Sequence, residues 1–270
     1  MVKLESNWLD LRTLDELALQ KTPIHQLGAG TKLGTTLAFI MVVASFSRYE
    51  VTGLIPCVFY PIVLITLGRL PYQLLLKRLL LVAPVILFIG LFNPLFDRVP
   101  VAAVGPLVVT GGWISFLSIS VKLILTITAA LILIATTGIH AICSTLYRLG
   151  VPQPLVVQIL FMYRYIHVLL EEVLKTLQAY QLRSCHNSGI GYQAWGSLLG
   201  QLLLRTIARA QRIYQAMLCR GYDGHIILET TAARKKPDLL YFAGWLLFFS
   251  LCRLVNLPQW LGTFITGGLP

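Results

Sequence analysis

Two arginines at matching positions are the side chains best placed for chemistry with another protein. Residues 181–184 are QLRS and residues 218–221 are LCRG, so Arg183 and Arg220 each close a segment of helical pattern, 37 residues apart. Gly221 suits the left-handed residue that follows a helix, and an arginine in the last turn offsets the negative end of the helix dipole. Ordinary capping explains one such end. Two of them also predict guanidinium groups at rigid tips, where each can form forked hydrogen bonds with a partner's carboxylate.

Metal ligation is the second chemistry that the residue types allow. The same region contains Cys185, His186, Cys219 and His225, and transition-metal sites use cysteine and histidine. Such sites usually show ordered spacing, such as CxxC or HxxxH, and none occurs here. We therefore predict that this chain has no metal site and that these residues are polar linker residues.

Nucleotide chemistry and acid–base catalysis find little support. The segment GAGTKLG at 28–34 lacks the Gly-Lys-Ser/Thr of a phosphate loop, and the chain has no Gly-Lys pair at all. Glu171 and Glu172 diverge as neighbours on a helix, and Lys175 lies four residues after Glu171, which is an ordinary helical ion pair. We predict no catalytic residue, no cofactor, and ATP handling by another chain.

The elements that must position these arginines belong to a membrane protein. The 270-residue chain is 56% hydrophobic and 12% charged, with a mean hydropathy of +0.75, whereas soluble domains carry about 25% charged residues. A spanning helix needs roughly 17–25 apolar residues. Five runs approach this length, and they cover residues 33–47, 51–68, 79–96, about 113–137 and 239–255.

Several details of these runs are open at this stage. The first run is short, so we expect Lys32 and Arg48 to extend toward the lipid headgroups. Lys122 lies inside the fourth run and is either a functional residue or a lysine that reaches the headgroups. Residues 99–112 are predicted to form a loop or broken element. Residues 256–270 are apolar and glycine-rich, and a sixth spanning or re-entrant segment there stays open.

Lysine and arginine placement predicts the orientation. With the N-terminus in the cytoplasm, 18 of the 22 basic residues lie inside, and only Arg48, Arg98 and Arg253 lie outside, as the positive-inside rule requires. The predicted fold is all-α. It comprises a membrane domain at 1–138, a cytoplasmic helical domain at 139–238 and a C-terminal span and tail at 239–270.

Two long helices are predicted in the cytoplasmic domain, at about 155–183 and 197–220. The second places Arg205, Arg209 and Arg212 on one face and apolar residues on the other. Each arginine at the bilayer centre costs about 2.5–3.5 kcal/mol, so this helix is not expected to span. The arginine face either binds anionic lipid, faces the ATPases or is solvated. Arg164 lies within an apolar segment, which favours a subunit or lipid interface.

The chain resembles the transmembrane T component of energy-coupling-factor transporters, in particular the cobalt-uptake type. The resemblance extends over nearly the whole chain and includes residues 14–33, 67–88 and 146–183. Its most specific features are two short motifs, normally Ala-Arg-Gly, that close two coupling helices. Here they are Leu-Arg-Ser at 182–184 and Cys-Arg-Gly at 219–221. Both arginines match, whereas Ser184 replaces a glycine and both alanines are replaced.

The resemblance implies a non-catalytic subunit with several partners. Two cytoplasmic ATP-binding-cassette ATPases each receive one helix tip, through Arg183 with Ser184 and Arg220 with Gly221. A separate membrane protein captures the ion, which is cobalt in this type, with nickel open. The implied location is the cell membrane, and nucleic acid is not an expected partner. Two alternatives stay open: a polytopic membrane enzyme such as a lipid-handling transferase, and a stand-alone carrier.

Overall fold

The structure is a computed structural model. It describes residues 17, 18, 20, 22–47, 52–96, 100–104, 107–183, 192–223 and 236–254. Two compact units make up the chain, one from Leu9–Ile142 with Thr231–Pro270 and one that includes Cys143–Thr230. The prediction of an all-α membrane helix bundle is confirmed, and each of the five apolar runs coincides with helix.

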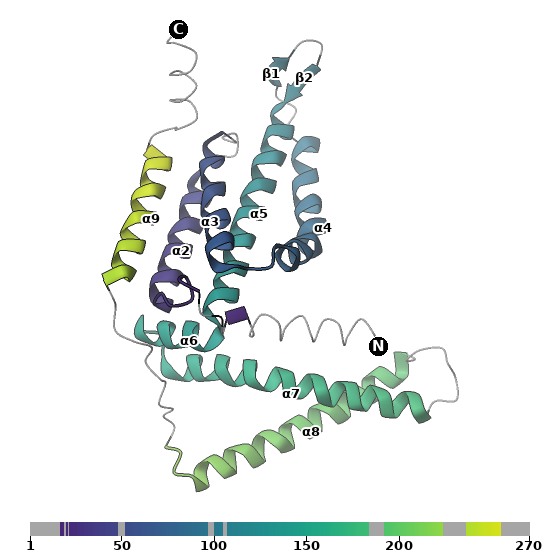
Figure 1. The fold of residues 1–270 in the computed structure, drawn as a ribbon. Helices are drawn as coiled ribbons and strands as arrows, with labels where there is room; N and C mark the ends of the chain where they lie inside the picture. The colour runs from purple at the N-terminus through teal and green to yellow at the C-terminus, as the bar shows by residue number, and fades with distance from the viewer. Residues whose placement is uncertain are drawn as a thin grey trace. The chain divides into compact units, whose positions relative to one another are not determined.

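The first unit is a bundle around one central helix. Its helices are α2 (Ala29–Ser45), α3 (Phe59–Gly68), α4 (Tyr72–Phe96), α5 (Gly111–Thr137) and α9 (Lys236–Leu254), with 3-10 turns η1 (Thr52–Leu54) and η2 (Pro56–Val58) before α3. Helix α5 packs against α2, α3 and α4, while α9 packs against α2 on the other side (Figure 1). The order of the helices in space therefore differs from their order in the chain.

Aromatic side chains fill the core between α2, α3 and α9. Phe39 and Tyr60 are stacked with ring centroids 4.5 Å apart, and Trp245 meets the edge of Tyr60 at 4.8 Å. Phe249 lies 5.3 Å from Tyr60. Such pairs add about 0.5–1.5 kcal/mol beyond the burial of their surface, so this cluster fixes how the C-terminal helix α9 joins helices from the first third of the chain.

A short hairpin replaces the loop expected at residues 99–112. Strands β1 (Pro100–Val104) and β2 (Leu107–Thr110) pair antiparallel. Val104 opposes Leu107, and Pro100 opposes Thr110. The two apolar segments PVAAV and LVVT flank a Gly-Pro pair, which is a turn signal between strand-forming residues. The expectation of a loop was wrong because the valines on both sides of the Gly-Pro pair favour strands, and the glycines had been taken to indicate a loop throughout.

Two lysines link α2 to α5 at both ends of their contact. The Nζ of Lys32 donates to the carbonyl of Thr136 at 2.8 Å, and that of Lys122 donates to the carbonyl of Phe46 at 2.6 Å. Each amine satisfies a carbonyl near the C-terminal end of the other helix, where the last carbonyls lack helical partners. The expectation that Lys32 extends to the headgroups was wrong, because its side chain is buried within the bundle.

The lysine contacts also define the geometry of the pair. Lys32 and Phe46 are 14 residues apart, and so are Lys122 and Thr136, which corresponds to about 21 Å along each helix. The two helices are therefore antiparallel, and the stretches between the two contacts have the same length. At the same end as Lys32, the carboxylate of Asp238 accepts a hydrogen bond from the Gly28 backbone N–H at 3.1 Å. The start of α9 is thus joined to the start of α2.

The second unit contains most of α6 (Ile139–Arg148) and two long helices, α7 (Gln153–Arg183) and α8 (Tyr192–Cys219). The predicted helices at 155–183 and 197–220 are confirmed to within a few residues. Within the described residues, α5 and α7 are long and apolar enough to cross a membrane by length and composition. Helix α7 meets that criterion because its acidic residues lie only in its second half.

Candidate partner-docking site

The tip of α8 is a fully formed helix stop. Gly221 adopts φ 82°, the left-handed conformation that an Arg-Gly end predicts. The N–H of Tyr222 donates to the carbonyl of Met217, and the N–H of Gly221 donates to that of Leu218, each at 3.0 Å. These two bonds define a Schellman motif. Arg220 is the capping residue and is exposed, so its backbone is fixed at a rigid helix end and its side chain is accessible from outside its own unit.

The tip of α7 presents its arginine in a similar way. Arg183 is the last residue of α7, and its side chain is exposed. Its neighbour Leu182 is 90% exposed, so the last turn of α7 is accessible from outside its own unit. Ser184, the other residue predicted for this tip, lies outside the described residues.

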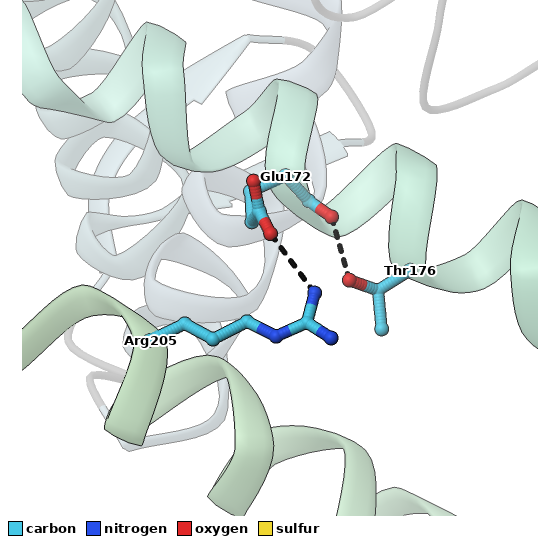
Figure 2. Close-up of polar contacts among 3 residues, drawn as sticks. All are labelled: Glu172, Thr176 and Arg205. Atoms are coloured by element: carbon cyan, nitrogen blue, oxygen red, sulfur yellow. Dashed lines mark hydrogen bonds and ion pairs between the residues drawn. The ribbon is translucent and has the colours of Figure 1, made fainter. Parts of the chain in front are cut away.

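Helices α7 and α8 cross, and an ion pair joins them at the crossing (Figure 1). Figure 2 shows Arg205 of α8 extending to Glu172 of α7, with Nη1 and Oε1 3.1 Å apart. The side chains are 60% and 25% exposed, so the pair contributes about 0.2–1 kcal/mol. The hydroxyl of Thr176 donates to the Glu172 carbonyl at 2.7 Å. The ion pair therefore determines where α7 and α8 meet, and it adds little to the stability of their contact.

The crossing places the two tips far apart. Arg183 lies 11 residues beyond Glu172 and Arg220 lies 15 residues beyond Arg205, which gives arms of about 16 Å and 22 Å. In Figure 1 the C-terminal ends of α7 and α8 point to opposite sides of their crossing. One small protein surface therefore cannot cover both arginines, whereas two separate partners can each take one.

The arginine face of α8 is the second part of the candidate site. Arg205 is held by Glu172, Arg209 is half-buried beside α7, and Arg212 is exposed. Residues 192–219 include these three arginines and no aspartate or glutamate. The helix thus carries a charge of +3 that only Glu172 of the facing helix partly offsets within the described crossing.

Arg164 lies on the surface of α7. Its guanidinium carbon is 6.0 Å from the ring centroid of Tyr165, at the outer limit for a cation–π contact, and its side chain is exposed. Exposed apolar side chains follow a helical spacing on the opposite face of α7, at Leu155, Ile159, Met162 and Ile166. An interface at Arg164 stays a prediction.

The metal-ligand candidates are mostly outside the described residues, where Cys185, His186 and His225 lie. Among the described residues, no three His, Cys, Asp or Glu side chains converge, and Cys219 is exposed at the end of α8. His25, at the approach to α2, hydrogen-bonds Thr22 at 2.6 Å. Burial lowers the pKa of His25, and the charge of Lys32 lowers it further, so this ring is held neutral as a structural residue.

Sequence reasoning missed two features of this region. The first is the partner of Glu172: the sequence pairs Glu171 with Lys175 and gives Glu172 no partner, because its contact with Arg205 requires knowledge of the crossing point. The second is a groove between α7 and α8. The residues that line the groove follow the helical spacing of apolar residues on both helices. This periodicity is the sequence signal from which the groove could have been predicted.

The fold and the site together define the class of protein: a helical membrane bundle with a pair of long crossing helices that end in exposed arginines. The family model described as CbiQ, cobalt transport protein, matches residues 20–230. The chain belongs to this family, whose members are embedded in membranes.

Two curated relatives are similar to parts of the chain. An uncharacterized protein of Methanocaldococcus jannaschii, MJ1571, is 29% identical over 118 residues, which are 43% of this chain and 40% of the relative. The nickel permease LarQ of Lactiplantibacillus plantarum is 28% identical over 117 residues, which are 42% of this chain and 43% of the relative. The chain thus aligns with about two-fifths of the length of each relative.

Proposed function

We propose that the chain is the non-catalytic coupling subunit of an ATP-driven importer of the energy-coupling-factor type. It works at the cell membrane, with its N-terminus and the helices α7 and α8 in the cytoplasm. Two ATP-binding-cassette subunits hydrolyse ATP, and a separate membrane subunit captures the substrate. The observation that carries this proposal is the pair of exposed arginines, Arg183 and Arg220, on diverging helices that cross at one point.

The geometry supports a lever mechanism. A guanidinium docked in a groove can form two parallel bonds to a carboxylate, so each helix end follows the ATPase that holds it. A helix of 31 or 28 residues moves as one stiff element when its end is displaced, and closing of two ATPases changes the angle at the crossing. A capture subunit in contact with α7 or α8 is then tilted by that change.

The substrate proposed is a divalent first-row metal ion, cobalt first and nickel second. The family description and the name of the nickel permease LarQ support this class. This chain is proposed to move the ion's carrier and to leave ligation to the capture subunit. No group of metal-binding side chains is therefore required in α7 or α8.

The test is the double variant Arg183→Ala with Arg220→Ala, assayed in the assembled transporter. We expect radioactive cobalt uptake at the background level, loss of ATPase subunits on co-purification, and normal insertion in the membrane. The matched control is Arg148→Ala, because Arg148 also lies in a last helical turn before a left-handed glycine, Gly150 with φ 94°.

The control separates docking from helix capping. If capping alone matters, the control and the tip variants lose a similar amount of stability and all of them transport. Wild-type uptake by the double variant, with its ATPases still bound, would refute the proposal.

A further inference from the structure

The groove between α7 and α8 has a shape and composition that suit an acyl chain. Its volume is about 490 Å³, within the range of small-molecule sites. Phe161, Tyr165 and Val168 line it from α7, and Ile213 and Met217 line it from α8. This lining is apolar and open to the outside of the unit, and such surface is normally covered in a working protein.

A cationic cleft adjoins this groove at the crossing. Arg205, Arg209 and Arg212 line it together with Glu172. Arg209 lines both the cleft and the apolar groove, so charge and apolar surface are continuous. Three guanidinium groups face one carboxylate, which leaves an excess of positive charge beside an apolar channel.

We propose that this composite site binds one anionic phospholipid, with the phosphate on Arg209 and Arg212 and an acyl chain in the groove. Charge complementarity selects this occupant: a zwitterionic lipid brings a cation together with its phosphate to a site that already has an excess of positive charge, and a soluble phosphate leaves the groove uncovered. Arginine is the residue suited to phosphate because its donors match phosphate oxygens in pairs. The groove reaches the α8 tip at Met217 and Tyr222. Arg209 and Arg212 lie 11 and 8 residues before Arg220, so variants of these two arginines test the lipid site and leave the docking arginines in place.

The experiment titrates the full-length protein in detergent with dioleoyl phosphatidylglycerol or dioleoyl phosphatidylcholine, and native mass spectrometry counts the bound lipid. We expect a clear preference for phosphatidylglycerol. Each basic residue near an anionic lipid contributes about fivefold in affinity. Arg209→Gln should therefore weaken phosphatidylglycerol binding by about fivefold, and the double variant with Arg212→Gln by roughly 25-fold.

Matched controls test the charge and the groove separately. Arg148→Gln removes an exposed arginine of the same unit that lines neither part and should leave the preference unchanged. Ala210→Trp fills the groove and should lower binding of both lipids, whereas Ala216→Trp, exposed on the same helix, should not. Glycerol 1-phosphate in large excess should fail to displace the lipid.

Three results would overturn the proposal: equal binding of the two lipids, a preference that survives loss of both arginines, or full displacement by glycerol 1-phosphate. Circular dichroism checks that each variant is helical. If the glutamine pair does not fold, the single variants Arg209→Gln and Arg212→Gln replace it, and each must lower the preference. An unchanged preference in both folded single variants would equally contradict the site.

Discussion

The helix pairs α2/α5 and α7/α8 use basic side chains in opposite ways. In the first pair, Lys32 and Lys122 donate to backbone carbonyls of the partner helix. In the second, Arg183 and Arg220 are exposed at the ends. Burying an ammonium group costs free energy unless the group is hydrogen-bonded, so these lysines need acceptors that their own helix bundle supplies. An exposed arginine has no such need, and its position at a tip makes it useful to another protein.

The comparison also separates two kinds of helix contact. In the α2/α5 pair, both helices carry fully buried residues, such as Val43 and Ala129, in addition to the lysine bonds. At the α7/α8 crossing, an exposed ion pair and a groove take their place. The α2/α5 contact is closed by buried side chains, whereas the α7/α8 contact leaves apolar and charged surface exposed. A family member that couples motion needs both properties in one chain.

Replacement of Lys32 by methionine should have the largest effect on stability. It leaves the Thr136 carbonyl without its donor inside the bundle, and loss of a buried hydrogen bond to a charged group costs about 1.5–3 kcal/mol. Lys122→Met, whose amine is only partly buried, should cost about 1 kcal/mol. Denaturant unfolding in detergent measures both. If neither variant lost stability, the contrast between the lysine-linked pair and the open one would be removed.

The tip of α8 offers a test with opposite signs at two glycines. Gly221→Ala forces a side chain into φ 82° with no neighbouring atom within 4 Å, so the cost is one of backbone conformation, about 1 kcal/mol. Gly196→Ala, within α8 and equally unobstructed, should stabilise by about 0.5–1 kcal/mol. Thermal unfolding measures the signs. If both alanines stabilise, the left-handed stop is not what fixes Arg220.

The smallest effect is expected at the crossing itself. Glu172→Gln removes the carboxylate that Arg205 contacts at 3.1 Å, and an exposed pair of this kind contributes about 0.2–1 kcal/mol. High salt should weaken the wild type by the same amount and the variant hardly at all. A loss of several kcal/mol would mean that α7 and α8 form a closed pair like α2 and α5.

The sequence predicts α7 and α8 well because helical periodicity and an Arg-Gly end are local signals. The segments at 155–183 and 197–220 differ from the observed helices by at most five residues at an end. It cannot predict the lysine contacts, since their partners lie 104 and 76 residues away. Which carbonyl a buried amine reaches depends on which helix becomes its antiparallel neighbour, and that is settled by packing of the whole bundle.

The candidate site divides along the same line. Both arginine ends are visible in the sequence, as is the basic face of α8. The ion pair with Glu172 and the groove beside it could be predicted only if the crossing point of α7 and α8 were known. Helical periodicity indicates which faces of the two helices meet, but not which residues lie opposite one another. Docking by Arg183, Ser184, Arg220 and Gly221 stays a prediction until the assembled transporter is tested.

The equal spacing of the two lysine contacts has a mechanical consequence. Because the bonds at Thr136 and Phe46 close both ends of a stretch of the same length on α2 and α5, a slide of one helix by a single residue, about 1.5 Å, strains both bonds at once. The pair therefore resists axial translation and tolerates only small rocking about its length. A transport cycle that runs through this chain must draw its stroke from elements other than these two helices.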